Sequence, residues 1–447
     1  MNADLDLLRL RLAGGPQPAR ALMEALGLSQ PTLSRRLAAL GPQVVRLGAA
    51  RSIQYTLRDT LRGLPDIPVY RVDTKGQLSR LGLLVPVRSD GFVMHAEAGD
   101  TLYSPGLPWW LLDMRPQGYL GRAYVARHGA ALGLPARLGD WSDTHALQAL
   151  LVHGHDAVGN LLLGDTARGQ FLAMAAGAPI PMAGKPATYA RLAREAARGE
   201  SPGSSAGGEQ PKFSAWAATA DGPRHVLVKF SEAEPGPVSQ RWRDLLLAEH
   251  LALQTLAEAG VSATRTGVLD AGAQRFLEVQ RFDREGPLGR RGIVSLAAMD
   301  AEFVGAGPVP WPVVVQRLAD AGHVRFDAVQ GAALLWAFGT LTGNTDMHGG
   351  NLSFMTEQGS PWALAPAYDM SPMGFAPRSG GGLPDTLSPA NLHPAIAHGT
   401  WRQADALAAR FLARAQAERG FSRRFAPCLA ALARHQTAAR DTLARLG

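Results

Sequence analysis

Residues 343–354, Gly-Asn-Thr-Asp-Met-His-Gly-Gly-Asn-Leu-Ser-Phe, constrain this chain more than any other stretch. Asp346 and Asn351 lie five positions apart within it, and Asp369 follows in the segment Ala-Pro-Ala-Tyr-Asp-Met of residues 365–370. Two carboxylates and an amide oxygen suit Mg²⁺, a hard cation that takes oxygen ligands. The D-x-x-x-x-N spacing is typical of a phosphoryl-transfer loop, in which the aspartate accepts a hydroxyl proton and the asparagine holds a metal ion. We therefore expect Asp346 to be catalytic and Asn351 and Asp369 to be metal ligands.

The same residues are also compatible with an ordinary turn. Gly, Asn and Asp dominate turns for backbone reasons, so residues 344–351 would then simply end the apolar run at 332–341. Asp369 would be a cap elsewhere in the fold. The residues upstream are what favour the catalytic interpretation.

A lysine and a glutamate stand upstream at the positions that phosphoryl transfer requires. His-Val-Leu-Val-Lys-Phe at 225–230 predicts a strand with Lys229 near its end, similar to the V-A-I-K strand whose lysine contacts the α- and β-phosphates. Twenty residues later, Glu249 lies in a predicted amphipathic helix and is placed to pair with Lys229. The alternative is a solvated glutamate, since the same helix carries other acidic residues.

The segment 199–212, Gly-Glu-Ser-Pro-Gly-Ser-Ser-Ala-Gly-Gly-Glu-Gln-Pro-Lys, is rich in glycine and poor in apolar residues. Glycines let backbone N–H groups approach phosphate oxygens without a Cβ clash, and Lys212 would add a cation beside them. The alternative is a glycine-rich linker, because the segment matches neither the P-loop pattern nor G-x-G-x-x-G. Lysine occurs at only four positions in the chain, and two of them, Lys212 and Lys229, fall in this proposed nucleotide site.

These motifs resemble one known family. G-N-T-D-x-H-x-x-N followed by P-x-Y-D is similar to the HipA family of serine/threonine kinases, which are toxins of bacterial toxin and antitoxin pairs. The resemblance covers about residues 66–447 and implies a two-lobed, protein-kinase-like fold with ATP and Mg²⁺ as cofactors. It also implies that His348, two residues after Asp346, orients the loop or contacts phosphate.

The same resemblance implies nucleotide contacts and a phosphorylation site. Ser-Ala-Gly-Gly-Glu-Gln-Pro-Lys at 205–212 resembles the family's loop, in which the serine equivalent to Ser205 is autophosphorylated. Phe-Leu-Glu-Val-Gln-Arg-Phe-Asp-Arg at 276–284 resembles the hinge whose backbone groups bind adenine, although Gln280 replaces the more usual glutamate. The nucleotide-binding residues expected in the whole site are Gly207, Gly208, Gln210, Lys212, Lys229, Glu249, Gln280 and Phe282.

Residues 1–62 form a small basic unit with a helix-turn-helix pattern. Three helices are predicted, the last two at 18–26 and 30–40, followed by two strands around a glycine-containing turn at 44–57. Gly-Leu-Ser-Gln-Pro-Thr-Leu-Ser-Arg-Arg-Leu resembles the recognition segment of bacterial winged-helix regulators. The residues predicted to contact duplex DNA are Gln30, Thr32, Arg35 and Arg36 in the major groove, and Arg46 and Arg51 at phosphates.

A protein-binding module is the alternative for this unit, because winged helices also mediate contacts without DNA. In the usual arrangement of the HipA family the DNA-binding antitoxin is a separate chain, so an attached unit of this kind departs from the pattern. It leaves open whether a separate antitoxin protein is a partner of this chain. Residues 63–68, rich in Pro and Gly, are predicted to be the linker to the next domain.

Composition limits the class of protein. Apolar residues make up 46% of the 447 residues and charged residues 19%, which is a globular balance for two or three domains. The net charge of +7 permits an anionic partner. One cysteine, Cys428, excludes an internal disulfide framework, and no apolar run predicts an export signal or a membrane-spanning helix. We therefore expect a cytoplasmic protein with no membrane partner.

We predict an α+β chain with a winged helix-turn-helix domain at 1–62, an α/β region at 66–180, and a kinase core at 181–447 with a helical C-terminal lobe. The predicted activity is ATP-dependent phosphorylation of serine or threonine in a protein. An aminoacyl-tRNA synthetase is implied as the substrate by the family resemblance alone. Two alternatives remain open: a small-molecule kinase, and a catalytically idle transcriptional regulator bound to DNA.

Overall fold

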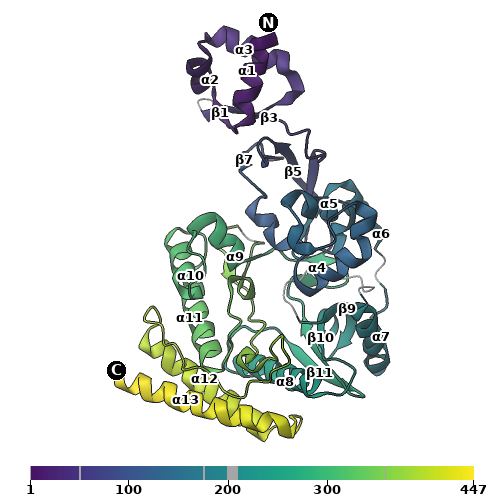
Figure 1. The fold of residues 1–447 in the computed structure, drawn as a ribbon, viewed down its shortest axis with the longest axis vertical. Helices are drawn as coiled ribbons and strands as arrows, with labels where there is room; N and C mark the ends of the chain where they lie inside the picture. The colour runs from purple at the N-terminus through teal and green to yellow at the C-terminus, as the bar shows by residue number, and fades with distance from the viewer. Residues whose placement is uncertain (1, 50–51, 175–176, 199–209, 358, 447) are drawn as a thin grey trace.

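The computed structural model describes residues 2–49, 52–174, 177–198, 210–357 and 359–446. Helices and strands are interspersed along these residues, and the ladders between the named strands are antiparallel, which confirms the predicted α+β class. Figure 1 shows a small N-terminal unit at one end, a middle domain beside it, and two further lobes that end in the C-terminal helices.

The N-terminal unit packs three helices against a three-stranded sheet of order β1-β3-β2. Buried leucines from all three helices form its core because apolar residues recur at helical spacing in each. The helices and the two strands that the sequence predicted over residues 18–57 are present. The elements are α1 (Asn2–Ala13), β1 (Gln17–Pro18), α2 (Ala19–Leu26), α3 (Gln30–Leu40), β2 (Val44–Leu47) and β3 (Gln54–Leu57).

Arg36 on α3 was expected to point outward into a DNA groove, and the structure corrects this. Its guanidinium lies 2.7 Å from the Asp4 carboxylate of α1, and only 22% of its side chain is exposed. The acidic residue on the neighbouring helix therefore holds Arg36 as a tie between α1 and α3. Of the other predicted DNA contacts, Gln30, Arg35 and Arg46 are exposed and Thr32 is half-buried, whereas Arg51 lies outside the described residues.

The middle domain is a five-stranded sheet of order β7-β6-β5-β4-β8 with helices packed on it. Alternate residues of β4, including Ile67 and Val69, are fully buried in its core, as expected for a strand in the interior of a sheet. The elements are β4 (Ile67–Val72), β5 (Leu78–Val87), β6 (Gly91–Ala96), β7 (Thr101–Ser104), η3 (Trp109–Met114), α4 (Gly118–Tyr124), α5 (Asp143–His153), η7 (Gly154–Asp156), β8 (Leu161–Leu163) and α6 (Gly164–Ala173).

Of the predicted linker at 63–68, only residues 63–66 lie outside helix and strand. Ile67 already begins β4, and the residues before it are held in place, since Arg62 donates hydrogen bonds to three backbone oxygens around the β5–β6 turn. Proline content misled the prediction. Pro68 stands where β4 pairs with β5 but not yet with β8, so the strand tolerates its missing N–H there. The N-terminal unit also packs against the middle domain, because Val45 and Leu47 of β2 share a buried apolar cluster with Val85 and Val87 of β5.

The next lobe is a four-stranded sheet of order β11-β12-β10-β9 with a helix on each face. Phe276 of β12 packs with Tyr189 of α7, and the adjacent Leu277 packs with Leu246 of α8. Because neighbouring residues of a strand point to opposite faces, the two helices cover opposite sides. The elements are α7 (Lys185–Ala197), β9 (Lys212–Thr219), β10 (Gly222–Phe230), α8 (Pro237–Glu258), β11 (Thr266–Ala271) and β12 (Gln274–Gln280).

The C-terminal lobe is mainly helical and is centred on α11 (Phe326–Leu341). This helix is apolar on nearly every side because α10 (Trp311–Asp320) and α12 (His398–Ala417) both pack on it. It ends before Gly343, which adopts a φ of 75° that other residues rarely take, and the chain then turns into residues 344–351. The remaining elements include β13 (Arg284–Glu285), β14 (Gly289–Arg290), β15 (Ile293–Ser295), α9 (Leu296–Met299), η9 (Asp300–Val304), η10 (Gly349–Asn351), β16 (Ser353–Met355), β17 (Ala363–Leu364) and α13 (Ala426–Leu446).

Residues 378–385 form neither helix nor strand. A buried arginine nevertheless holds this part of the chain. Arg241 of α8 donates hydrogen bonds to the backbone oxygens of Phe375, at 2.8 Å, and Pro384, at 2.6 Å. Arg241 thus fixes both sides of the segment to the helix that carries Glu249.

Candidate active site

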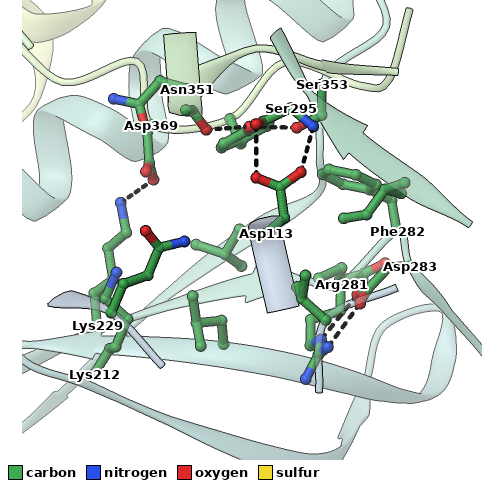
Figure 2. A pocket seen from close by; sticks show the side chains of 18 of the residues that line it. Asp113, Lys212, Lys229, Arg281, Phe282, Asp283, Ser295, Asn351, Ser353 and Asp369 are labelled. Carbon is green, nitrogen blue, oxygen red and sulfur yellow. Dashed lines mark hydrogen bonds and ion pairs between the residues drawn. The ribbon is translucent and has the colours of Figure 1, made fainter. Parts of the chain in front are cut away.

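One pocket gathers most of the predicted nucleotide and metal residues (Figure 2). It encloses about 200 Å³ between the β9–β12 sheet and the loops that follow α11. The middle domain contributes Asp113 of η3, Gln117 and Val158 to its wall. The predicted site residues that line the pocket are Lys212, Lys229, Gln280, Phe282, His348, Asn351 and Asp369.

Lys229 is the centre of a buried ionic group. Its ammonium lies 2.6 Å from the Glu249 carboxylate and 2.5 Å from the Asp369 carboxylate. Burial alone would lower the pKa of Lys229, but the two carboxylates outweigh it and hold the pKa above its ordinary value. Burial raises the pKa of Glu249 although Lys229 opposes the shift. The predicted pairing of Lys229 with Glu249 is thus present in the structure.

Asp369 has an uncommon backbone conformation and an ionised side chain. Its φ is 54°, in the left-handed region that non-glycine residues seldom occupy. Burial raises the pKa of Asp369, but Lys229 and Lys212 outweigh it and hold the pKa below its ordinary value, so the carboxylate is ionised at neutral pH. Asn344, which the sequence analysis did not single out, donates its side-chain amide to the Asp369 backbone oxygen at 3.3 Å.

Asn351 presents its amide in the orientation that a cation requires. The amide nitrogen donates a hydrogen bond to the backbone oxygen of Asp346 at 2.7 Å, which leaves the amide oxygen as the side chain's acceptor. One ionised carboxylate, from Asp369, and one amide oxygen make a small ligand set. Such a set fits Mg²⁺, which proteins commonly hold with one or two carboxylates together with substrate phosphates and water.

Asp346 lies on the same loop but outside the pocket lining, and 53% of its side chain is exposed. Its backbone N–H donates to the Asn344 side-chain oxygen at 3.0 Å. Asn344 therefore connects the segment that carries Asp346 to the segment that carries Asp369. The Nδ1 atom of His348 accepts from the Gly350 N–H, which places the proton of a neutral ring on Nε2. That Nε2 is 3.9 Å from the Asp346 carboxylate. With 53% of its side chain exposed, Asp346 is accessible from solvent.

The segment that resembles the family's hinge contributes Gln280, Arg281 and Phe282 to the pocket lining. The side chain of Gln280 points away from it, since its amide nitrogen contacts Asp221 at 3.3 Å. Its backbone oxygen accepts from the Thr264 hydroxyl at 2.6 Å and retains a second lone pair. Replacing the family's usual glutamate by glutamine therefore alters a side chain on the far side of the strand. The Phe282 ring packs 5.6 Å from the Tyr368 ring at the pocket floor.

The glycine-rich segment is described only at its end. Ser205, Gly207 and Gly208 lie outside the described residues, whereas Gln210 is half-buried and Lys212 is buried in the pocket wall at the start of β9.

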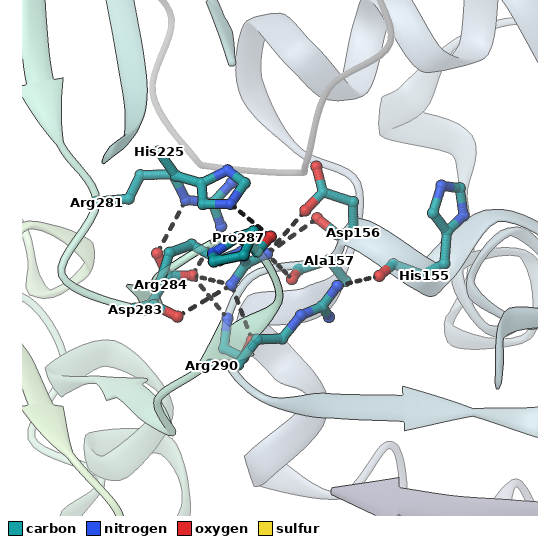
Figure 3. A network of polar contacts seen from close by, with 10 residues as sticks. His155, Asp156, Ala157, His225, Arg281, Asp283, Arg284, Pro287 and Arg290 are labelled. Atoms are coloured by element: carbon teal, nitrogen blue, oxygen red, sulfur yellow. Dashed lines mark hydrogen bonds and ion pairs between the residues drawn. The ribbon is translucent and has the colours of Figure 1, made fainter. Parts of the chain in front are cut away.

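A buried network fixes the middle domain to the hinge (Figure 3). Asp283 accepts from Arg281 at 2.7 Å and from Arg284 at 2.6 Å. Arg284 also reaches the Asp156 carboxylate of η7 at 3.0 Å. Burial raises the pKa of Asp283, but the two arginines outweigh it and hold the pKa well below the ordinary value. The hinge is thus clamped to the middle domain by charge-assisted hydrogen bonds.

Several residues of the pocket escaped the sequence analysis. Tyr368 donates to the Gly350 backbone oxygen at 2.7 Å and could have been noticed, because it directly precedes Asp369. Asp113, in contrast, comes from η3 of the middle domain and has no motif around it. The pocket residues missed from the sequence include Asp113, Arg281, Ser295, Ser353 and Tyr368.

Two family models match the chain. The model described as "YjjJ-like toxin, middle domain" matches residues 64–172, and the model described as "HipA-like C-terminal domain" matches residues 204–439. The protein named Toxin YjjJ of Escherichia coli (strain K12) is 40% identical over 402 residues, which cover 90% of each chain. The chain belongs to the HipA family of toxins. The family match also spans the loop, the hinge and the Asp346 segment of this HipA-family chain.

Two solved structures resemble this HipA-family chain more distantly. One is from the complex of the Shewanella oneidensis MR-1 toxin–antitoxin system HipA, HipB and its operator DNA, with 16% identity and a TM-score of 0.45 over 85% of this chain and 97% of that one. The other is the Helicobacter pylori proinflammatory kinase CtkA, with 12% identity and a TM-score of 0.38 over 54% of this chain and 94% of that one. Among the helices of the described residues, none is both long and apolar enough to cross a membrane.

Proposed function

We propose that this chain is an ATP- and Mg²⁺-dependent protein kinase that transfers phosphate to serine or threonine. The observation that carries the proposal is the buried Lys229, which contacts Glu249 at 2.6 Å and Asp369 at 2.5 Å in the pocket that also contains Asn351. Phosphoryl transfer requires a cation to hold the phosphates and oxygen ligands to hold the metal, and this cluster supplies both.

The position of each residue indicates its role in the proposed reaction. Backbone groups at Gln280 and Phe282 bind adenine at one end of the pocket, and Lys212 and Lys229 bind phosphate oxygens at the other. Asn351 and Asp369 hold Mg²⁺, which neutralises the charge that spreads over the transferred phosphoryl group. Asp346 accepts the proton of the attacking hydroxyl.

The exposure of Asp346 favours a macromolecular substrate. A hydroxyl on the surface of a folded protein can reach a carboxylate that is 53% exposed, whereas a small-molecule kinase usually encloses its acceptor. We infer that the acceptor is a serine or threonine of a protein. An aminoacyl-tRNA synthetase is the substrate class that the family resemblance implies.

We also propose that residues 1–62 bind duplex DNA. Exposed Gln30 and Arg35 on α3 and exposed Arg46 on β2 place polar and basic groups where a recognition helix and an adjacent strand would meet a groove and its phosphates. The Shewanella oneidensis complex contains HipB and operator DNA together with HipA. An antitoxin protein is accordingly proposed as a further partner of this chain.

The test compares phosphorylation in cells that briefly express the wild type or Asp346→Ala. We expect phosphoserine or phosphothreonine to appear on one or a few proteins with the wild type and to be absent with the variant. Phosphate on a small metabolite alone would instead favour a small-molecule kinase. No dependence on Asp346 in either fraction would favour a catalytically idle regulator.

A further inference from the structure

Asp113 brings a carboxylate from the middle domain into the pocket of the kinase lobes. It lies on η3, and its two oxygens accept hydrogen bonds from the Ser295 N–H and the Ser295 hydroxyl, each at 2.6 Å. Ser295 in turn caps α9, because its hydroxyl accepts from the Ala298 N–H at 3.1 Å. Asp113 is therefore fixed in place by an element nearly two hundred residues away in the sequence.

The position of Asp113 corresponds to the middle of a bound nucleotide. Asp113 lines the same pocket as Phe282, at the hinge end, and Asp369, at the phosphate end. Figure 2 shows Asp113 drawn between these two residues with its carboxylate near Ser295. In a nucleoside triphosphate the ribose joins the base to the phosphates. If the hinge binds the base and Lys229 binds phosphate, the ribose lies in this part of the pocket.

The Asp113 carboxylate has unused capacity to accept hydrogen bonds. Each carboxylate oxygen has two acceptor positions, and the two donors of Ser295 fill only one on each. Burial raises the pKa of Asp113 above its ordinary value in spite of those donors, so they offset only part of the desolvation. The side chain is half-buried and borders the pocket, so a ligand can supply a further donor.

We propose that Asp113 accepts a hydrogen bond from a ribose hydroxyl of the bound nucleotide. The inference rests on the proposed function, since it requires a nucleotide in this pocket. It adds that the middle domain completes the nucleotide site and makes the chain selective for nucleotides that carry the contacted ribose hydroxyl. Acidic side chains bind ribose hydroxyls elsewhere for the same reason, namely that a carboxylate is a strong acceptor for a neutral O–H donor.

The test measures dissociation constants of the full chain for Mg-ATP, Mg-2′-deoxy-ATP and Mg-3′-deoxy-ATP by titration calorimetry. All proteins carry Asp346→Asn to prevent turnover. We expect the parent to bind one deoxy form about tenfold to a hundredfold more weakly than ATP, the range for a hydrogen bond to a charged group. Asp113→Ala should bring that ratio close to one. Asp113→Asn, a milder change, should give an intermediate ratio if Asp113→Ala does not fold.

Asp244 offers a closely matched control. Its carboxylate accepts from the Ser422 N–H at 2.8 Å and from the Ser422 hydroxyl at 2.6 Å, but it does not line the pocket. Asp244→Asn should keep the parent ratio even if it lowers the melting temperature.

Three results would overturn the inference. If Asp113→Ala weakens all three nucleotides equally, Asp113 acts only by positioning Ser295. If the parent binds all three nucleotides equally, the chain does not distinguish ribose at all, although the proposed kinase activity stands. If the parent binds none of them, the proposed function fails and the inference fails with it.

Discussion

Asn351 donates its side-chain amide to the backbone oxygen of Asp346 across 2.7 Å. This hydrogen bond joins the proposed metal ligand to the backbone of the proposed proton acceptor and closes the loop between them. A hydrogen bond to the backbone does not depend on the Asp346 carboxylate, so substitutions of that carboxylate should leave the metal ligand in place. The two roles can therefore be separated by mutation.

We predict that Asp346→Asn and Asp369→Asn both abolish phosphoryl transfer, for different reasons. Loss of the proton acceptor at Asp346 should lower kcat by about 10²- to 10⁴-fold and leave Mg-ATP binding intact. Loss of the Asp369 carboxylate should weaken Mg²⁺ binding itself. Steady-state kinetics and a Mg²⁺ titration of ATP binding distinguish the two effects. Near wild-type turnover by Asp346→Asn would refute the assignment of Asp346.

The buried pair of Lys229 and Glu249 predicts a stability effect. Glu249→Ala removes one of the two carboxylates that pair with the buried Lys229 ammonium and leaves Asp369. Because the ammonium stays paired, the loss of unfolding free energy should be smaller than the roughly 3–5 kcal/mol that an uncompensated buried charge typically costs. Urea denaturation measures the loss. Glu258 lies on the same helix and pairs with Arg414, but 63% of its side chain is exposed. Glu258→Ala should therefore change stability little, and equal losses in the two variants would contradict the prediction.

Asp283 predicts how stability changes with pH. Burial raises its pKa, but Arg281 and Arg284 outweigh it, so the pKa is lower in the folded chain than in the unfolded chain. The carboxylate therefore stabilises the fold above its unfolded pKa of about 3.9, and the contribution is lost as the pH falls through the folded value. Urea unfolding of Asp283→Asn should show lower stability at pH 6 and a smaller further loss on going to pH 3.

A control for the Asp283 prediction is Asp327→Asn, which removes a carboxylate that is 64% exposed. Its unfolding free energy should follow the wild type at both pH values. If the unfolding free energy of Asp283→Asn falls as much as that of the wild type between pH 6 and pH 3, the network in Figure 3 does not cause the loss of stability in acid.

Local spacing was enough to predict the core of the site. The distance from Lys229 to Glu249 in the sequence places one at the end of a strand and the other on the following helix, and that geometry is set within a single lobe. Asp346, Asn351 and Asp369 come from one loop and the short strands that follow it. Hydrophobic periodicity likewise predicted the amphipathic helix that carries Glu249, which is present as α8.

Contacts between domains could not be predicted in this way. Asp113 meets Ser295, and Asp156 meets Arg284, only because the middle domain packs on the hinge, and neither carboxylate belongs to a periodic pattern. The same limit explains Arg36, whose outward direction on an isolated helix is overridden by Asp4 of α1. Helical periodicity predicts the direction of a side chain only where no residue on another element binds that side chain.

The contrast between Arg35 and Arg36 makes the DNA-binding proposal testable. Arg35 and Arg46 are exposed, whereas Arg36 is paired with Asp4. Removing Arg35 and Arg46 together should weaken DNA binding, and loss of the phosphate contact of Arg46 should reduce the slope of log K against log salt by about 0.9. Arg36→Ala should mainly lower the melting temperature of the N-terminal unit.

Arg20, whose side chain is 87% exposed on α2, is the control for the arginine variants. Arg20→Ala should leave both the affinity and the salt slope unchanged. Binding that does not respond to salt between about 50 and 200 mM would assign residues 1–62 to protein contacts instead.

The last prediction concerns Ser205, which lies outside the described residues. We predict that the chain phosphorylates Ser205 itself and that this lowers its affinity for ATP. A phosphoserine carries a charge of about −1.5 to −2 at neutral pH, and it would stand two residues before Gly207 in a segment proposed to bind phosphate. The added anion would repel ATP where Lys212 is meant to attract it. Purified protein incubated with Mg-ATP should therefore gain phosphate at Ser205 by mass spectrometry, with Asp346→Ala as the blank. Ser204 is the nearest competing acceptor. If the wild type gains phosphate at neither serine, the proposed self-inhibition by autophosphorylation is wrong.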